Sequence, residues 1–216
     1  MIQKQLSYKY QVYNELKKGI LTGQYPPGSV MRKLSEEMGI SRTPIREGLQ
    51  MLARDGWLQM ETYKGAVVRE FDPHYMWELS RIRYALELSA AEDAVKNMTD
   101  QGLERLRQIQ AAQREDLSNY NVDEFIRHDR EFHSCIYEMS LNRELMKLAS
   151  NYYDVFRFLG MQAVMGTEER RLTTIEEHQD ILEAMEQHNP KAAVQAMKKH
   201  MEQTETNIRR HIKIAP

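Results

Sequence analysis

Side chains that can bind metal ions interrupt the apolar faces of predicted helices in the second half of the sequence. They are one aspartate and three histidines: Asp129, His133, His178 and His200. Asp129 and His133 lie one helical turn apart, so both can reach a common point. A buried carboxylate is costly without a partner, so something must compensate Asp129. Carboxylate and neutral imidazole are ordinary ligands of divalent metals, so the pattern favours one metal site, with zinc first and nickel or manganese as alternatives.

The alternative to a metal is a hydrogen bond between Asp129 and His133, with two further histidines satisfied inside the core. For a single histidine on an apolar face this is the commoner explanation. Three histidines and an aspartate on three such faces favour the metal site instead. The other histidines fall at helix ends or on polar faces, where we expect them at the surface; they are His74, His128, His188 and His211.

The elements that would position these residues are helical. Six helices are expected, over 73–96, 99–118, 122–140, 142–165, 173–188 and 190–212. Asp72 before Pro73, Thr99 before Asp100 and Asn189 before Pro190 are typical helix starts. Thr173 and Thr174, followed by glutamates, form a capping-box pattern that predicts the start of another helix. Helices without strands predict an all-α bundle.

Composition limits the class of protein. The chain of 216 residues has one cysteine, Cys135, which excludes an internal disulfide and a multi-cysteine metal site. No apolar run is long enough to span a membrane, and the first residues lack the apolar stretch of a secretory signal. We therefore expect a cytoplasmic protein with no membrane partner.

Charge and glycine content divide the chain near residues 70–72. Residues 1–70 carry 11 Lys and Arg against 7 Asp and Glu, whereas residues 71–216 carry 19 against 25. A basic segment joined to an acidic one suggests a polyanion-binding domain followed by a second domain. We therefore expect two domains, 1–70 and 71–216.

The first segment has the element order of a winged helix-turn-helix. Helices are expected over 8–22, 32–38 and about 41–55, with Gly39 ending the second. Strand-like residues 57–60 and 66–68 then flank a hairpin tip. The predicted fold class is mainly α: an N-terminal winged helix-turn-helix with a small β-hairpin and a C-terminal all-α helical bundle.

Polar donors cluster at the start of the third helix, away from its apolar face. Arg42, Thr43 and Arg46 lie there, and Arg32 begins the helix before it. Residues in this position of a helix-turn-helix meet base edges in the major groove, where arginine can bond guanine with both arms. The alternatives are solvated or ion-paired arginines, or a winged helix that binds protein and never DNA.

Residues 8–70 closely resemble the N-terminal domain of GntR-family bacterial transcription regulators. Residues 41–57, SRTPIREGLQMLARDGW, look like that family's recognition-helix signature, and the turn 26–28 and Gly65 also fit. The resemblance implies that double-stranded operator DNA is the partner. It also implies which residues contact the DNA: Arg32, Arg42, Thr43, Arg46 and Gly65.

Residues 73–212 resemble the effector-binding FCD domain of the FadR-type branch of that family. Its metal-binding members carry Asp-x3-His in one helix and one histidine in each of two later helices, and all four positions are filled here, by Asp129, His133, His178 and His200. In that family a small organic acid binds beside the metal. Arg83 matches an arginine that can bind the acid's carboxylate; without the family, a surface ion pair with Glu87 explains it equally well. Asn142 matches a position that we take as a helix cap.

These features together predict a metabolite-responsive bacterial transcription regulator, expected to be a repressor, that binds operator DNA as a homodimer and senses a small carboxylate effector at a metal site. The alternative is a metal-dependent hydrolase, because three histidines and a carboxylate could activate water. The residues suggest no independent general base, and a hydrolase would leave the first domain unexplained. We therefore expect no enzyme activity.

Overall fold

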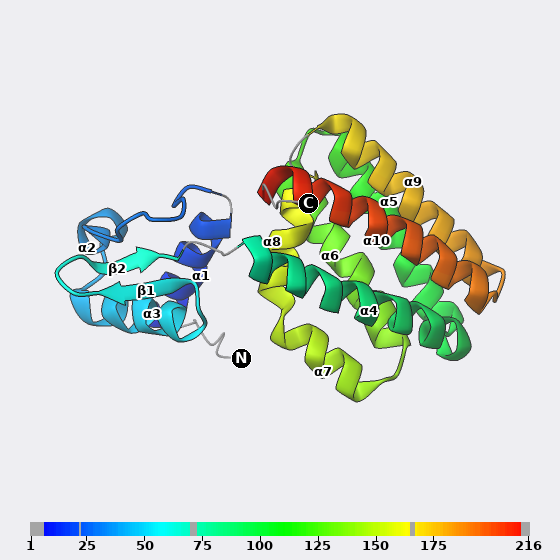
Figure 1. The fold of residues 1–216 in the computed structure, drawn as a ribbon, viewed down its shortest axis with the longest axis horizontal. Helices are drawn as coiled ribbons and strands as arrows, with labels where there is room; N and C mark the ends of the chain where they lie inside the picture. The colour runs from blue at the N-terminus through cyan, green and yellow to red at the C-terminus, as the bar shows by residue number, and fades with distance from the viewer. Residues whose placement is uncertain (1–6, 22, 70–72, 165–166, 213–216) are drawn as a thin grey trace, which may run out of the picture. The chain divides into compact units, whose positions relative to one another are not determined.

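The computed structural model describes the chain except residues 1–6, 22, 70–72, 165–166 and 213–216. The chain divides into two compact units, Met1–Asp72 and Pro73–Pro216, called here the N-terminal and C-terminal units. The described residues are mostly helical and include one two-stranded antiparallel sheet, which confirms the predicted fold class (Figure 1). None of their helices is long and apolar enough to cross a membrane.

The N-terminal unit contains three helices and a hairpin: α1 (Tyr8–Leu21), α2 (Leu34–Met38), α3 (Arg42–Arg54), β1 (Leu58–Glu61) and β2 (Gly65–Val68). α1 packs on α3, where Gly48 permits a close approach, since a Cβ there would lie 2.7 Å from Val12 Cγ1. The strands pair in antiparallel register from Leu58–Val68 to Glu61–Gly65. Gly65 has a φ of 88°, a backbone conformation that favours glycine.

The start of the second helix differs from the prediction. The sequence predicts a helix from Arg32, but α2 begins at Leu34. Val30 pairs with Val67, and the Met31 amide donates to the Ala66 carbonyl, so the chain is still extended beside β2 at this point. Arg32 is exposed just before α2 and does not belong to it.

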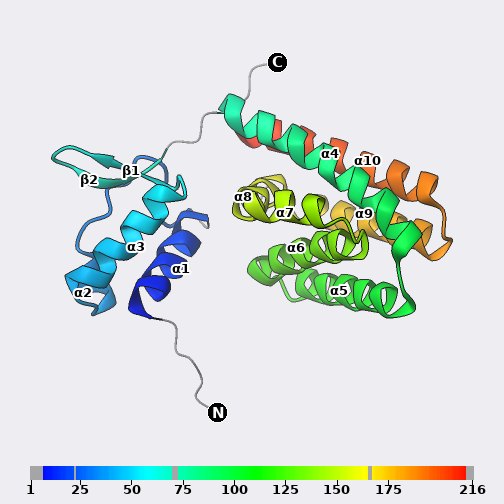
Figure 2. The same ribbon diagram turned by 90° about the horizontal axis from the view of Figure 1, so that it is seen from below.

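The C-terminal unit contains seven helices within the described residues: α4 (Pro73–Asn97), α5 (Asp100–Ser118), α6 (Val122–Met139), α7 (Arg143–Asn151), α8 (Tyr153–Val164), α9 (Glu168–Glu186) and α10 (Pro190–Ile212). α6 packs against α4, α5, α7 and α8, whereas α10 packs against α4, α8 and α9. Figure 2 shows α4 and α10 side by side at one side of the unit and α5 at the opposite side.

Two of the predicted helices have different bounds. The range 142–165 contains two helices, α7 and α8, separated at Tyr152. The helix expected from residue 173 begins at Glu168 instead, because the Thr167 side chain caps it by accepting from the Arg170 amide. The predicted capping box is therefore wrong: the hydroxyls of Thr173 and Thr174 bond the carbonyls four residues before them, inside α9.

Other predicted helix starts agree with the structure. The Thr99 side chain accepts from the Gly102 amide at the start of α5, and the Asn142 side chain accepts from the Leu145 amide at the start of α7. Pro190 is the first residue of α10. The predicted cap Asp72 lies outside the described residues.

A hydrophobic core occupies one end of the C-terminal unit. It joins the second half of α4, the first half of α5, the second half of α6, α7, the end of α9 and the first half of α10. Apolar side chains from these segments exclude water, so the polar residues in the adjoining turns of the same helices are also buried. The core therefore holds these helices at fixed positions beside the candidate site.

Candidate metal centre and DNA-binding face

Three histidines from different helices meet in the interior of the C-terminal unit. His133 of α6, His178 of α9 and His200 of α10 each offer a ring nitrogen, and these atoms lie within 4.8 Å of one another. All three residues are at most 2% exposed. Asp129 lies one turn before His133, with its Oδ1 3.6 Å from His178 Nε2. The structure thus brings the three predicted histidine ligands together, with the fourth predicted ligand, Asp129, beside His178.

All three rings are oriented in the same way. Each Nδ1 atom lies 2.8–2.9 Å from an oxygen of a neighbouring side chain; the neighbours are Glu87 for His133, Gln113 for His178 and Glu177 for His200. Such a contact fixes the proton on Nδ1 and leaves Nε2 with a free lone pair. Nε2 of His133 and of His178 is buried and has no hydrogen-bond partner. These atoms fit a metal ion, which would satisfy both.

Electrostatics keep two of these rings neutral. Burial lowers the pKa of His178 well below its usual value, and the neighbouring His200 and His133 lower it further. Burial also lowers the pKa of His133, against the opposing effect of Glu87. Metal ligation requires the unprotonated ring nitrogen, so both histidines are in the ligating form at pH 7.

Glu87 connects His133 to Arg83. Burial raises the pKa of Glu87, but its interactions with His133 and the charges of Arg83 and Arg130 outweigh burial, so the pKa falls to about 2. The Arg83 Nε donates to Glu87 Oε1 at 3.2 Å. The alternative of an ion pair between Arg83 and Glu87 is therefore confirmed, but its predicted place at the surface is wrong, because both side chains are at most 1% exposed.

A small cavity lies beside two of the predicted ligands, Asp129 and His200. Its lining comes from α4, α6, α8, α9 and α10: Arg83, Asp129, Gly160, Ala163, Thr174, His200 and Thr204. Arg83 Nη1 is buried without a hydrogen-bond partner. A Cβ at Gly160 would lie 3.6 Å from this nitrogen and 3.5 Å from Asp129 Oδ2. The absence of a side chain at Gly160 therefore keeps space between the guanidinium and the carboxylate.

Sequence reasoning missed the residues that hold the histidines. The sequence predicts Glu87 only as the partner of Arg83 and Glu177 only as part of the capping-box pattern, while Gln113 receives no role. A signal exists for Gln113, which lies seven residues after Leu106 and four before Leu117, on the apolar face of α5. A polar residue at a buried helical position requires a partner. Glu177 is itself held by the guanidinium of Arg170, with contacts of 3.0 Å.

The remaining histidines lie away from this centre. His74 and His188 are exposed, as predicted. His128 differs, because it is half-buried and its Nδ1 contacts Asp116 Oδ2. The side chain of His211 lies outside the described residues.

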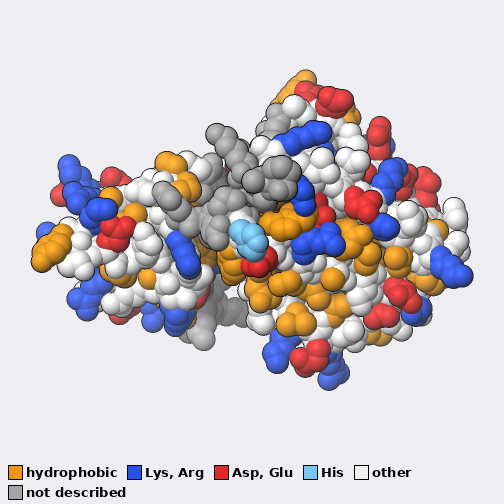
Figure 3. Space-filling model, viewed as in Figure 1, with side chains coloured by type: hydrophobic (Ala, Val, Ile, Leu, Met, Phe, Trp, Pro, Cys, Tyr) orange, Lys and Arg blue, Asp and Glu red, His pale blue; other side chains and the backbone are white. Residues whose placement is uncertain are grey.

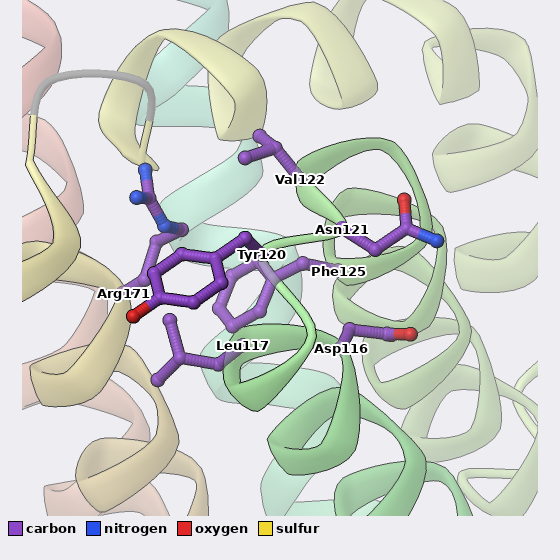
Figure 4. A pocket seen from close by; sticks show the side chains of 7 residues that line it. All are labelled: Asp116, Leu117, Tyr120, Asn121, Val122, Phe125 and Arg171. Atoms are coloured by element: carbon purple, nitrogen blue, oxygen red, sulfur yellow. The ribbon is translucent and has the colours of Figure 1, made fainter.

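A second hollow lies at the turn between α5 and α6, facing the start of α9. Figure 4 shows its lining: Asp116, Leu117, Tyr120, Asn121, Val122, Phe125 and Arg171. The Tyr120 ring is largely exposed. This hollow contains none of the predicted ligands, so we place no metal site in it.

The predicted DNA contacts lie on the surface of the N-terminal unit. Arg42, Thr43 and Arg46 are exposed at the start of α3, where the first amides of a helix attract phosphate. Within the described chain Arg42 and Arg46 form no ion pair, which weakens the alternative of intradomain pairing. Arg32 and Gly65 are also exposed. On the face drawn in Figure 3, Lys and Arg side chains stand at the edge of this unit.

Each of the two units matches a known protein family. Residues 9–68 match the family of bacterial regulatory proteins called gntR, and residues 78–203 match the FCD domain. The HTH-type transcriptional regulator YdhC of Bacillus subtilis, itself uncharacterised, is 29% identical over 92% of this chain and 90% of its own. The Uxu operon regulator of Haemophilus influenzae is 30% identical over 89% of this chain and 79% of its own.

A solved structure of McbR/YncC from Escherichia coli has the same fold. Its TM-score is 0.78 over 95% of this chain and 99% of its own, at 24% identity. The matched domains and relatives are transcription regulators and not enzymes. The metal-dependent hydrolase alternative therefore has no support from the comparisons.

Proposed function

Because the chain belongs to the GntR family of bacterial transcription regulators and carries an FCD domain, we propose that it is a metabolite-responsive repressor. In this proposal it binds operator DNA as a homodimer in the cytoplasm. A small carboxylate effector binds at a divalent metal held by the C-terminal unit. The observation that carries the proposal is the convergence of three buried histidines, whose Nδ1 atoms all contact neighbouring side chains and which each offer a ring nitrogen within 4.8 Å of the others.

The helix-turn-helix implies DNA binding. We assign base contacts to Arg42, Thr43 and Arg46, with Arg32 and Gly65 beside them. A bidentate arginine–guanine pair contributes roughly 1–3 kcal/mol of discrimination between bases. These side chains are exposed, and within the described part of the chain Arg42 and Arg46 form no ion pair, which leaves their donors available for DNA.

FCD domains commonly bind metal, and the histidine cluster fits one. We assign the ligands as Asp129, His133, His178 and His200. Zinc suits this ligand set, and nickel or manganese could replace it. When bound, a divalent ion supplies a positive centre that attracts an anionic ligand.

We assign the effector's carboxylate to Arg83. Its Nη1 has no hydrogen-bond partner and borders the small cavity beside the ligands. Guanidinium suits a carboxylate because its planar N–H groups match the two oxygens. As it stands the cavity has room for about one water molecule, so binding of an organic acid requires its lining to move.

α4 provides the route from effector to DNA. It carries Arg83 and Glu87, and it begins at Pro73, directly after the N-terminal unit. An effector that displaces α4 changes the placement of the two DNA-binding units of a dimer. It regulates only if it binds the two arrangements with different affinity. We propose that the effector favours the arrangement that releases DNA.

The DNA assignment is tested with the promoter region upstream of the protein's own gene. Fluorescence anisotropy of labelled duplex compares the wild type with the double variant Arg42→Ala, Arg46→Ala. Arg54→Ala is the matched control, because Arg54 is exposed at the other end of α3. We expect the double variant to lose at least about 30-fold in affinity, at 1–3 kcal/mol for each of two contacts, and the control to bind normally.

Equal binding by the wild type and the double variant at matched salt would refute the recognition-helix assignment. Absence of binding by the wild type would favour a protein-binding role for the N-terminal unit. The affinity of a real DNA interface also falls steeply as salt rises, because bound cations are released from the phosphates.

A further inference from the structure

One buried side chain of α5 contacts two of the four proposed ligands. Gln113 is 0% exposed. Its Oε1 accepts from His178 Nδ1 at 2.9 Å, and its Nε2 donates to Asp129 Oδ1 at 3.5 Å. α5 supplies no ligand to the centre, so Gln113 connects this helix to both α6 and α9.

The other two residues that hold histidines face a different pair of partners. Glu87 accepts from His133 and Arg83, and Glu177 accepts from His200 and Arg170. Each of these glutamates therefore faces two donors, and an ionised carboxylate offers only acceptors.

Gln113 faces one donor and one acceptor. The Nδ1–H group of His178 needs an acceptor, whereas the carboxylate of Asp129 needs a donor. An amide is the side chain that offers both groups in one plane. A carboxylate at position 113 would lie about 3.5 Å from the carboxylate of Asp129, and the two like charges would repel. Glutamine therefore suits its two partners, just as Glu87 and Glu177 suit theirs.

The ring of His178 has little freedom to rotate away from Gln113. Phe132 stacks on it with ring centroids 4.0 Å apart and an interplanar angle of 4°. The plane of the ring is thus set by packing. The hydrogen bond that Nδ1 makes then determines the tautomer of the ring. With the proton on Nδ1, the lone pair is on Nε2, which lies 3.6 Å from Asp129 Oδ1.

We propose that Gln113 is a positioning residue of the metal centre, which fixes the tautomer of His178 and the orientation of Asp129 at the same time. It acts through these two ligands and does not itself coordinate the ion. The inference rests on the proposed function, because it requires that the four ligands bind a metal.

The test compares Zn²⁺ affinity in the full-length protein, measured by competition with a chromophoric chelator. Gln113→Met keeps the approximate length of the side chain and removes both polar groups. We expect its Kd for Zn²⁺ to rise about 10- to 100-fold, the usual effect of losing a residue that orients a ligand.

Gln110→Met is the matched control. Gln110 is also buried on α5, one turn before Gln113, and its Nε2 donates to the Ile175 carbonyl of α9. It forms no hydrogen bond with any of the four proposed ligands. We expect Gln110→Met to lower the melting temperature while its Kd for Zn²⁺ stays at the wild-type value.

A second readout separates positioning from packing. In the metal-free protein, ¹⁵N NMR of the imidazole should show His178 protonated at Nδ1 in the wild type and as a mixture of tautomers in Gln113→Met. If circular dichroism shows that Gln113→Met does not fold, Gln113→Asn takes its place. Asn keeps the amide but is one methylene shorter, and we expect its Kd to rise about 10-fold.

The outcomes distinguish the two proposals. If His178→Ala loses Zn²⁺ but Gln113→Met and Gln113→Asn bind it as the wild type does, the role of Gln113 is wrong and the metal centre stands. A wild-type protein that binds no Zn²⁺, Ni²⁺ or Mn²⁺ would overturn both. A Kd that rises equally in Gln110→Met would also overturn the positioning role.

Discussion

Single residues decide the protonation of the candidate centre. His178 and His133 have lowered pKa values in the folded chain, so near pH 6 the unfolded chain binds more protons than the folded one. Stability therefore falls as pH drops through the ordinary histidine value of about 6.5. Glu87, whose pKa is lowered to about 2, adds a separate loss below about 4.5.

We predict that the metal-free protein is less stable at pH 5.5 than at pH 7.5. For one group the loss is at most about 1.4 kcal/mol per pH unit below its unfolded pKa. Thermal unfolding in the presence of a chelator measures it. His178→Gln, which cannot titrate, should show a smaller difference between the two pH values. An equal difference in wild type and variant would show that His178 is not buried in neutral form.

Helical periodicity places Asp129, His133, His178 and His200 on apolar faces, and the resemblance to metal-binding FCD domains then assigns them as ligands. The sequence does not pair them with the residues that hold them. Gln113 and His178 are 65 residues apart, and nothing local to α5 shows which side chain will face it. Partners of this kind depend on how helices pack, which periodicity leaves open.

At the level of elements, the packing of α1 against α3 holds α3, the proposed recognition helix, in place in the N-terminal unit. Gly48 lies where the helices are closest, and a methyl group there would clash with Val12 and approach the Lys9 carbonyl at 3.2 Å. Overpacking of this kind destabilises by about 1–3 kcal/mol.

We predict that Gly48→Ala lowers the stability of the N-terminal unit and its DNA affinity, while the Kd for Zn²⁺ is unchanged. Gln50→Ala, an exposed change on the same helix, is the control. Differential scanning calorimetry and DNA anisotropy measure the effects. A Gly48→Ala protein with wild-type stability and DNA binding would contradict the close approach of α1 and α3.

Element bounds show where sequence reasoning fails. Buried residues continue at helical spacing through the break between α7 and α8, at Leu145, Ala149, Phe156, Leu159 and Ala163. A periodic pattern therefore gives no sign that the chain turns at Tyr152. The predicted start of α9 is wrong for another reason. The sequence contains two successive candidate caps, and the helix begins at the earlier one, Thr167.

At the level of the whole molecule, a homodimeric regulator carries two DNA-binding units related by one two-fold axis. A symmetric dimer reads two half-sites about 34–36 Å apart, one turn of DNA, or a multiple of that distance. Inserting about half a turn, roughly five base pairs, moves one half-site to the opposite face of the duplex.

We predict that light scattering gives twice the mass of one chain and that the half-turn insertion weakens operator binding strongly. A full-turn insertion should weaken it less, because both half-sites again face the same side. A monomer in solution, or an affinity that does not depend on the insertion, would rule out the symmetric two-site arrangement.

The most direct test of the metal centre is an anomalous difference map from crystals of protein loaded with Zn²⁺, recorded at the zinc edge. The account predicts one strong peak per chain in the C-terminal unit, about 2.0–2.2 Å from Nε2 of each histidine and from an Asp129 oxygen. The peak should vanish in His178→Ala. A wild-type map with no peak among Asp129, His133, His178 and His200, or with zinc only at surface residues, would contradict the central claim.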